Sequence, residues 1–428
     1  MNALPPALTW MHLLPAGSSI ECESCPASFV ERVRRHAPVG NDAVVVINGG
    51  ATAAKELGNA GYASARRFAV MPSLEKARWF IPLDSGRVAA GAFNIYTPAR
   101  RSAHLKKFAV QVAARLRLPG WYRDEIVIAS RARSPLEMKL AELFPREEIR
   151  VGLSAGAPEL ALNRKVSGAV LGAKGQVLAF VKLAESDIAR RIARHEAAML
   201  PQLSRRDELA GLTPKLLFAG EIDGRFVTVQ SPLAAKNVPP ARWTDGHDRF
   251  LAALRVGPTK PAAHTQLAVT LAARIASLPP VEIDVDLMDA LEDVMPTLES
   301  MFVPSTIVHG DFAPWNLRVS RGRVSAFDWE YAELDGLPLI DQTHFAMQLS
   351  YQMQGQTPQA AQGELDAFAQ RRPLGLEPQQ VRALQAVYLL DSLARLLGEG
   401  YPADDDMIAW YTTLLGRLCP RRREAVAV

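Results

Sequence analysis

Features that mark secreted or membrane-spanning proteins are scarce in this sequence. Three cysteines in 428 residues are too few for a disulfide framework in a chain of this size. No run of about 18 apolar residues occurs, and the first residues lack a basic segment and are interrupted by Pro5 and Pro6. These absences predict a soluble protein without a membrane span, located in the reducing cytoplasm. Cys22 and Cys25 form a single C-x-x-C, for which two ordinary thiols are favoured over metal or redox chemistry.

A concentrated positive charge is also missing. The 49 Lys and Arg residues exceed the 45 Asp and Glu residues only slightly, which gives a net charge of +4. The basic residues are scattered along the chain, apart from Arg421, Arg422 and Arg423. Proteins that bind nucleic acid usually gather such residues into a stripe, so the pattern disfavours a nucleic-acid partner. The 48% hydrophobic content is enough to build the cores of two or three domains.

The first third of the chain has the pattern of an α/β unit. The apolar run Ala43–Ile47 is followed by Gly49 and Gly50 and then by a helix-like stretch, which predicts a strand, a turn and a helix. Further short apolar runs indicate additional strands, and a basic helix follows; they occupy residues 67–70, 79–83, 92–96 and 102–118. We expect residues 1–145 to form an N-terminal α/β domain of unknown role.

The pattern changes near Glu147 to that of a small sheet with one helix. Strands are predicted at 149–151, 165–171, 177–183 and 225–230, and a long amphipathic helix at about 186–203. A proline-containing segment, Ser231–Leu233, interrupts this part. Beyond it the chain is mostly helical, except for short strands between Thr306 and Asp328. We therefore expect one lobe at 146–235 and a second, helical lobe at 236–428.

One carboxylate lies on the apolar face of the predicted helix. Glu196 follows Ile192 by four residues and so shares its buried stripe. A buried carboxylate is costly unless a cation meets it, and Lys182 on the preceding strand is the candidate. A strand lysine held by a helix glutamate orients nucleotide phosphates in kinases. From these two residues alone, a surface pair without function is equally compatible.

The C-terminal insert carries the strongest signal. In the stretch 307–316, IVHGDFAPWN, Asp311 precedes Asn316 by five positions, and two short strands follow, joined at Gly322. A hairpin centred on Gly322 is expected to bring Asn316 beside Asp328. Two oxygen-bearing side chains with Asp311 nearby form a site suited to Mg²⁺ on a polyphosphate.

This stretch, HGDFAPWNL followed by FDWE, resembles the motif of the aminoglycoside phosphotransferase and choline kinase family. The resemblance spans roughly residues 147–420. It implies an α+β, bilobal protein-kinase-like fold, with a small β-sheet N-lobe and a mostly helical C-lobe, here preceded by the small α/β domain. It further implies that Asp311 is the catalytic base and that Asn316 and Asp328 hold Mg²⁺.

The resemblance also assigns supporting roles. Lys182 and Glu196 would position the phosphates of ATP. Asp341 would brace the catalytic loop, and His309 would pack that loop rather than act as an acid or base.

The sequence departs from the family pattern at the nucleotide. No G-x-G-x-x-G precedes Lys182, and the segment Leu153–Pro158 takes its place. Its backbone N–H groups from Ser154 to Ala157, with Gly156 between them, are expected to meet the phosphates, whereas Pro158 has no N–H to offer. The purine is expected at the backbone between Gln230 and Leu233. Leu233 is the better donor there because Pro232 has no N–H.

These residues predict an ATP-dependent phosphotransferase that acts on a hydroxyl of a small molecule, such as a sugar, an amino alcohol or an aminoglycoside-like compound. The alternative is a nucleotide-binding pseudokinase that acts as a scaffold through its N-terminal domain. That alternative is disfavoured because the key polar residues are all present. A protein kinase is disfavoured because no clear activation segment follows Asp328. The sequence leaves the acceptor and any protein partner open.

Overall fold

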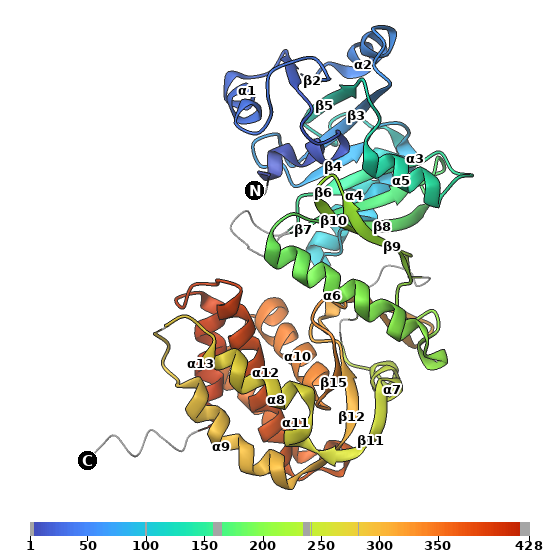
Figure 1. Ribbon diagram of the computed structural model, residues 1–428. Helices are drawn as coiled ribbons and strands as arrows, with labels where there is room; N and C mark the ends of the chain where they lie inside the picture. The colour runs from blue at the N-terminus through green and yellow to red at the C-terminus, as the bar shows by residue number, and fades with distance from the viewer. Residues whose placement is uncertain are drawn as a thin grey trace. The chain divides into compact units, whose positions relative to one another are not determined.

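The computed structural model describes residues 4–98, 101–156, 165–233, 240, 242–280 and 282–419. The chain divides into two compact units. Figure 1 shows both and labels most of their helices and strands. The first unit comprises Met1–Ala197 and Pro214–Pro232, and the second comprises Ala198–Thr213 and Leu233–Val428. Among the described helices, none combines the length and hydropathy needed to cross a bilayer.

A ten-stranded sheet runs through the first unit. Its strand order is β1-β2-β5-β3-β4-β6-β7-β8-β10-β9. β1 and β2 are parallel, and the other neighbours are antiparallel. The strands are β1 (Ile20–Glu23), β2 (Ala43–Ile47), β3 (Ser64–Met71), β4 (Trp79–Pro82), β5 (Asp124–Ser130), β6 (Arg150–Ser154), β7 (Lys165–Leu171), β8 (Val177–Ala184), β9 (Leu216–Ile222) and β10 (Arg225–Gln230).

Helices cover both faces of this sheet, which explains its continuous apolar runs. All five residues of β2 are buried: Val45 and Ile47 pack with Trp10 and Phe29 on one face, whereas Val44 and Val46 pack with α2 on the other. The helices are α1 (Ala27–Arg34), α2 (Gly50–Asn59), α3 (Gly86–Ala92), α4 (Arg101–Leu116), α5 (Pro135–Leu143) and α6 (Asp187–Ser204), with 3₁₀ turns at Pro6–Leu13 and Phe93–Ile95. The last residues of α6 and the 3₁₀ turn Asp207–Leu209 belong to the second unit.

Most predicted strands of this unit are present. The strands predicted at 165–171 and 177–183 correspond to β7 and β8, and the predicted helix at 102–118 to α4. The strand suggested at 92–96 is wrong, because these residues end α3 and form a 3₁₀ turn whose Phe93 packs into the core. The sequence of β5 lacks the alternation of polar and apolar residues that identifies a half-buried strand, because both faces of β5 are buried.

The sheet continues across residue 145, where a domain boundary was expected. Trp79 and Phe80 of β4 pair with Ser154 and Leu153 of β6. The 1–145 segment therefore shares one sheet with the strands that follow it. In contrast, the end of the first unit at Pro232 lies close to the boundary expected near residue 235.

The second unit is mostly helical, and α12 lies at the centre of its core. Buried residues surround α12 on nearly all sides, as expected for a helix that is apolar all round. The helices are α7 (Asp245–Ala253), α8 (Gln266–Ala276), α9 (Leu287–Ser300), α10 (Ile340–Gln348), α11 (Pro358–Gln370), α12 (Pro378–Gly398) and α13 (Asp406–Leu418); a π-helix spans Leu349–Gln354, and 3₁₀ turns lie at Ala262–His264, Pro314–Asn316 and Pro373–Gly375.

Two small sheets complete the second unit. One has the order β11-β12-β15, and the other is the hairpin β13-β14. Their strands are β11 (Arg255–Pro261), β12 (Phe302–Val308), β13 (Leu317–Ser320), β14 (Arg323–Ala326) and β15 (Glu333–Gly336).

The hairpin turn consists of Arg321 and Gly322, which both have positive φ (49° and 73°), as a two-residue type I′ turn requires. The register differs by one residue from the expected one. Leu317 pairs with Ala326, and the N–H of Phe327 donates to the carbonyl of Asn316 at 3.1 Å. Asn316 thus lies opposite Phe327, and Asp328 follows directly.

Candidate active site

In the first unit, Lys182 and Glu196 form the pair that the sequence predicts. Lys182 Nζ lies 2.7 Å from Glu196 Oε2 and 2.9 Å from Oε1. The glutamate side chain is fully buried and the lysine is 15% exposed. Small residues of α6, including Ala189 and Ala193, allow the helix to pack against the end of β8, which brings Glu196 over the sheet. The carboxylate thus fixes a partly exposed ammonium group.

Polar side chains share the sheet face of Lys182. Lys182 pairs across the strands with Ser167 of β7 and Thr228 of β10, and Gln230 lies two residues further along β10. Side chains at paired and alternate positions point to the same face. Thr228 Oγ1 and Gln230 Nε2 are buried and have no hydrogen-bond partner among the described residues. Such orphaned groups are uncommon and are expected to have a ligand or water as partner.

The predicted phosphate segment is described only in part. Ser154 ends β6, and Gly156 follows with φ of 76°, a conformation that favours glycine. The N–H of Gly156 lies 3.5 Å from Ser154 Oγ, and the rest of the segment, up to Pro158, falls outside the described residues. Leu233 follows β10 without regular structure, and its side chain is half-buried.

In the second unit, a tight turn after β12 presents Asp311. The turn passes through Gly310, whose φ is 78°; a Cβ at this position would lie 2.3 Å from the carbonyl oxygen of Tyr331, so only glycine fits. The backbone N–H groups of His309 and Gly310 donate to the two carboxylate oxygens of Asp341, at 2.8 and 3.1 Å. Burial raises the pKa of Asp341 to about 7, although these two hydrogen bonds oppose the shift. Asp341 therefore holds the turn from below, as predicted.

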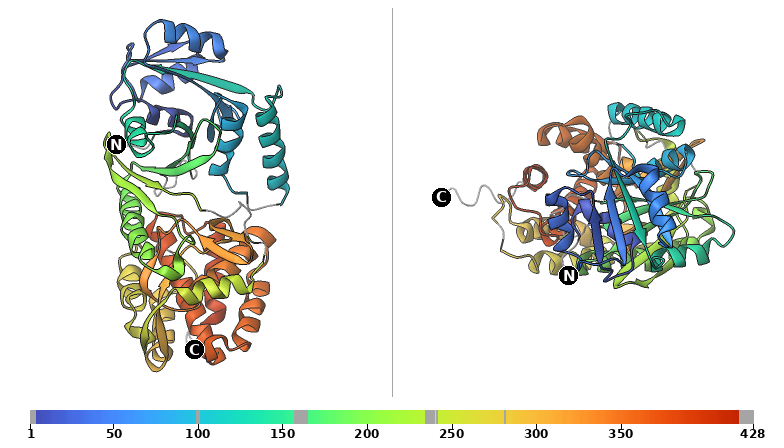
Figure 2. Two further views of the ribbon diagram at one scale, coloured as in Figure 1. Left: turned by 90° about the vertical axis from the view of Figure 1, so that its right-hand side faces the viewer. Right: turned by 90° about the horizontal axis from the view of Figure 1, so that it is seen from above.

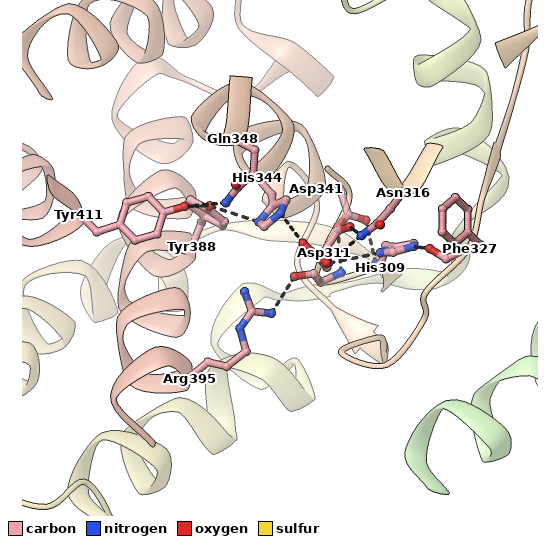
Figure 3. Close-up of polar contacts among 11 residues, drawn as sticks. His309, Asp311, Asn316, Phe327, Asp341, His344, Gln348, Tyr388, Arg395 and Tyr411 are labelled. Atoms are coloured by element: carbon pink, nitrogen blue, oxygen red, sulfur yellow. Dashed lines mark hydrogen bonds and ion pairs between the residues drawn. The ribbon is translucent and has the colours of Figure 1, made fainter. Parts of the chain in front are cut away.

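The carboxylate of Asp311 is held at both oxygens (Figure 3). Its Oδ1 lies 2.9 Å from His344 Nε2, and its Oδ2 accepts from Asn316 Nδ2 at 2.7 Å. The Asp311 side chain is 24% exposed, so the group is fixed but reachable. Burial raises its pKa, but the hydrogen bond and charge of His344, with the charge of Arg395, outweigh burial and hold the pKa below the ordinary value. Asp311 is therefore ionised at neutral pH.

A chain of hydrogen bonds extends from His344 into the core, as Figure 3 shows. His344 Nδ1 lies 3.2 Å from the Tyr388 hydroxyl, which lies 3.0 Å from the Tyr411 hydroxyl, and Gln348 Nε2 donates to Tyr411 at 3.0 Å. Because an ionised carboxylate can only accept, His344 Nε2 is the donor in the hydrogen bond to Asp311.

His309 has a structural role, in agreement with the prediction. Its Nδ1 accepts from the Asp311 N–H at 3.2 Å, and its Nε2 donates to the Phe327 carbonyl at 3.0 Å. Burial lowers the pKa of His309 to about 4, so the ring stays neutral and keeps these two roles. The ring also packs on Trp329, with centroids 4.4 Å apart. His309 thus joins the turn that presents Asp311 to the segment that carries Asp328.

Asn316 and Asp328 flank Asp311 with hard oxygen donors. Asn316 uses Nδ2 to bind Asp311, so its Oδ1 is the atom that could ligate a cation. Asp328 has a φ of 70°, a left-handed conformation that is costly for a residue with a Cβ. The negative charge of Asp328 opposes the ionisation of Asp311. A cation would relieve that repulsion, so the donor set fits a hard ion such as Mg²⁺.

The profile of the phosphotransferase enzyme family matches residues 99–384 of this chain. The chain belongs to this family. It is a small-molecule phosphotransferase. No curated protein matches the chain.

This phosphotransferase also has a distant likeness to several solved structures. A thermostable mutant of an aminoglycoside phosphotransferase, in ternary complex with AMP-PNP and hygromycin B, is 16% identical; the match covers 69% of this chain and 100% of that one, with a TM-score of 0.48. A choline/ethanolamine kinase family protein from Mesorhizobium loti is 17% identical over 64% of this chain and 88% of that one, with a TM-score of 0.39. A putative fructosamine-3-kinase from Haemophilus somnus is 14% identical over 66% and 96%, with a TM-score of 0.44.

Sequence reasoning missed several polar residues of the phosphotransferase that support Asp311. Arg395 donates to the Gly310 carbonyl at 2.8 Å and lies over the Tyr331 ring, with 4.4 Å to the centroid. His344 lies three residues after Asp341, so helical spacing could have placed it on the same side of α10. Tyr388 and Arg395 are seven residues apart on α12, a spacing that defines one face but does not indicate which site it meets.

Replacing Asp341 is expected to destabilise the second unit. Asp341→Ala leaves the buried N–H groups of His309 and Gly310 without an acceptor, which is expected to lower the free energy of unfolding by about 2–4 kcal/mol. Asp366→Ala is the matched control: Asp366 is 37% exposed and pairs with Arg382 on the surface, so its loss is expected to cost less than about 1 kcal/mol. Urea unfolding of both variants measures the difference. Equal midpoints would show that Asp341 does not hold the turn.

Proposed function

We propose that this phosphotransferase moves the γ-phosphoryl group of ATP to a hydroxyl of a small molecule. The observation that carries the proposal is the state of Asp311: an ionised carboxylate, fixed at both oxygens and still reachable, beside hard oxygen donors. Phosphoryl transfer depends mainly on positioning and on charge neutralisation, and these groups supply both.

In this proposal, Asp311 accepts the proton of the attacking hydroxyl as the oxygen approaches the γ-phosphorus. A carboxylate with a lowered pKa is a weak base, so its contribution lies chiefly in orienting the hydroxyl. His344 and Asn316 restrict the carboxylate to one orientation. The hydrogen-bond chain through Tyr388 and Tyr411 in turn fixes the ring of His344.

Mg²⁺ is the cation that Asn316 and Asp328 would hold. When bound, it neutralises charge on the transferring phosphates. Asn316 donates a hydrogen bond to Asp311, and the negative charge of Asp328 raises the pKa of Asp311. Both residues offer oxygen atoms of the kind that Mg²⁺ prefers.

ATP would be held by residues of β6, β8 and β10 and of the segments that follow β6 and β10. Lys182, fixed by Glu196, is proposed to bind the phosphates, together with the backbone N–H groups of Ser154 and Gly156. Gln230 and Leu233 are proposed to meet the purine. The orphaned amide of Gln230 supports this assignment, because a ligand would supply the missing partner.

The acceptor is proposed only as a class: a small molecule with a hydroxyl group, such as a sugar, an amino alcohol or an aminoglycoside-like compound. A panel of such compounds, tested for those that stimulate ADP release from MgATP, would identify it. The first compound that does so serves as acceptor in the three experiments below.

Asp311→Asn and Asp328→Asn are expected to separate the base from the metal ligand. Asp311→Asn keeps the size of the side chain, so MgATP binding is expected to stay close to normal while kcat falls by about 10²–10⁴. Asp328→Asn removes an anionic ligand, so nucleotide binding is expected to weaken in the presence of Mg²⁺ but not in its absence. Calorimetric titration with and without Mg²⁺ gives the two affinities. The reverse pattern would exchange the two roles, and normal turnover in both variants would exclude the proposed chemistry.

Lys182→Ala is expected to lower kcat/KM for MgATP by about 10²-fold, because a cation on the transferring phosphates is lost. Glu196→Ala is expected to have a similar effect and also to lower the melting temperature, because the ammonium loses its buried partner. Lys215→Ala, on the exposed surface of the same unit, is the matched control and should change neither quantity. Full activity in Lys182→Ala would remove Lys182 from the nucleotide site.

His344→Gln is expected to move the acidic limb of the pH profile of kcat/KM to higher pH. The hydrogen bond from His344 lowers the pKa of Asp311, and burial alone raises it. Without His344 the carboxylate therefore protonates at higher pH, where it no longer accepts a proton. Tyr388→Phe should shift the limb in the same direction by less. His36→Gln, an exposed histidine in the first unit, is the control. A uniform loss of rate without a shift would show that His344 is merely structural.

A further inference from the structure

Four apolar side chains lie exposed along the outer face of α4. Leu105, Phe108, Val112 and Leu116 are 72%, 66%, 37% and 63% exposed. Their spacing of three, four and four residues places them on one face of the helix. Single exposed apolar residues are common, but a continuous row of them usually marks an interaction surface. We call these four residues the α4 stripe.

The opposite face of α4 is already packed, so the stripe is not a core face left open by chance. Ala114 is buried and Val110 partly buried against the α3 residues of the same cluster. Gln111 Nε2 donates to the Ala90 carbonyl at 3.1 Å, and Lys107 Nζ donates to the Tyr96 carbonyl. In the left view of Figure 2, α4 lies along the outer edge of the first unit.

Positive charge surrounds the stripe. The segment 85–123 contains no Asp or Glu, although it carries several Lys and Arg residues. Lys106 and Arg115 are exposed on α4 itself, and Arg115 joins Arg87 and Lys174 around a hollow of about 470 Å³ that Phe108 also lines. Within the described part of the chain, Arg87, Arg115 and Lys174 form no ion pair. The surface thus combines apolar side chains with unneutralised cations.

We propose that the α4 stripe docks on a lipid bilayer surface that carries anionic headgroups. A helix with an apolar outer face and flanking basic residues, but without acidic ones, lies in the interface with its apolar side chains at the acyl boundary. The cations then meet the headgroup phosphates and attract this surface to the membrane. All four apolar side chains come from one helix, so a helix lying along the bilayer surface can insert them together. This docking surface is separate from the residues proposed for phosphoryl transfer.

Flotation of the full chain with vesicles tests the proposal. Vesicles of phosphatidylcholine with about 30% phosphatidylglycerol are expected to bind at least about tenfold more protein than pure phosphatidylcholine, and salt at about 0.5 M should remove most of the difference. Phe108→Ser is expected to weaken binding to the anionic vesicles by about tenfold, because one large side chain no longer enters the interface.

Matched controls separate the stripe from general surface effects. Phe302→Ser removes a phenylalanine that is 63% exposed on β12, and Arg255→Glu reverses an exposed charge on β11; neither should change vesicle binding. Arg115→Glu should weaken it. Equal binding to neutral and anionic vesicles, or wild-type binding by Phe108→Ser, overturns the proposal. Self-association that Phe108→Ser abolishes, without vesicle binding, would overturn it in favour of a contact between copies. Phosphotransferase activity without vesicles should be the same in Phe108→Ser and the wild type.

Discussion

The buried carboxylate of Asp341 is the constraint on which the second unit's site depends. It accepts hydrogen bonds from the backbone N–H groups of His309 and Gly310, and these bonds fix the direction in which the chain leaves β12. That direction presents Asp311 to His344 on one side and to Asn316 on the other. Because Asp341 and His344 lie on the same helix, α10, the element that braces the turn also supplies the partner of its carboxylate.

The central helix of the second unit, α12, contributes both to the hydrophobic core and to the polar contacts around Asp311. α12 is buried on nearly every side, yet it contributes Tyr388 to the chain of hydrogen bonds and Arg395 to the Gly310 carbonyl. A buried polar network is favourable only when each member has a partner, which is the case from Gln348 to Asp311. The packing around α12 therefore supports the position of the Asp311 carboxylate as well as the stability of the unit.

In the first unit, one sheet joins the N-terminal segment to the strands that carry Lys182. Helices on both faces bury most of the strands, but the face around Lys182 retains polar groups, and Thr228 and Gln230 keep orphaned atoms among the described residues. A folded sheet tolerates such groups where a ligand completes them. We propose that the fixed ammonium and these orphaned atoms are two parts of one ligand-binding face.

The sequence alone predicts the strands β7 and β8, the amphipathic helix with Glu196 as partner of Lys182, and the loop with Asp311 and Asn316, because each follows from local periodicity or spacing. It does not predict that the sheet continues from β4 to β6, because the sequence of a strand buried on both faces does not indicate which strands pair with it. Only the tertiary structure shows the contacts that His344, Tyr388 and Arg395 make around Asp311. Their roles depend on how α10 and α12 pack beneath the turn, and helical spacing defines a face without saying what that face meets.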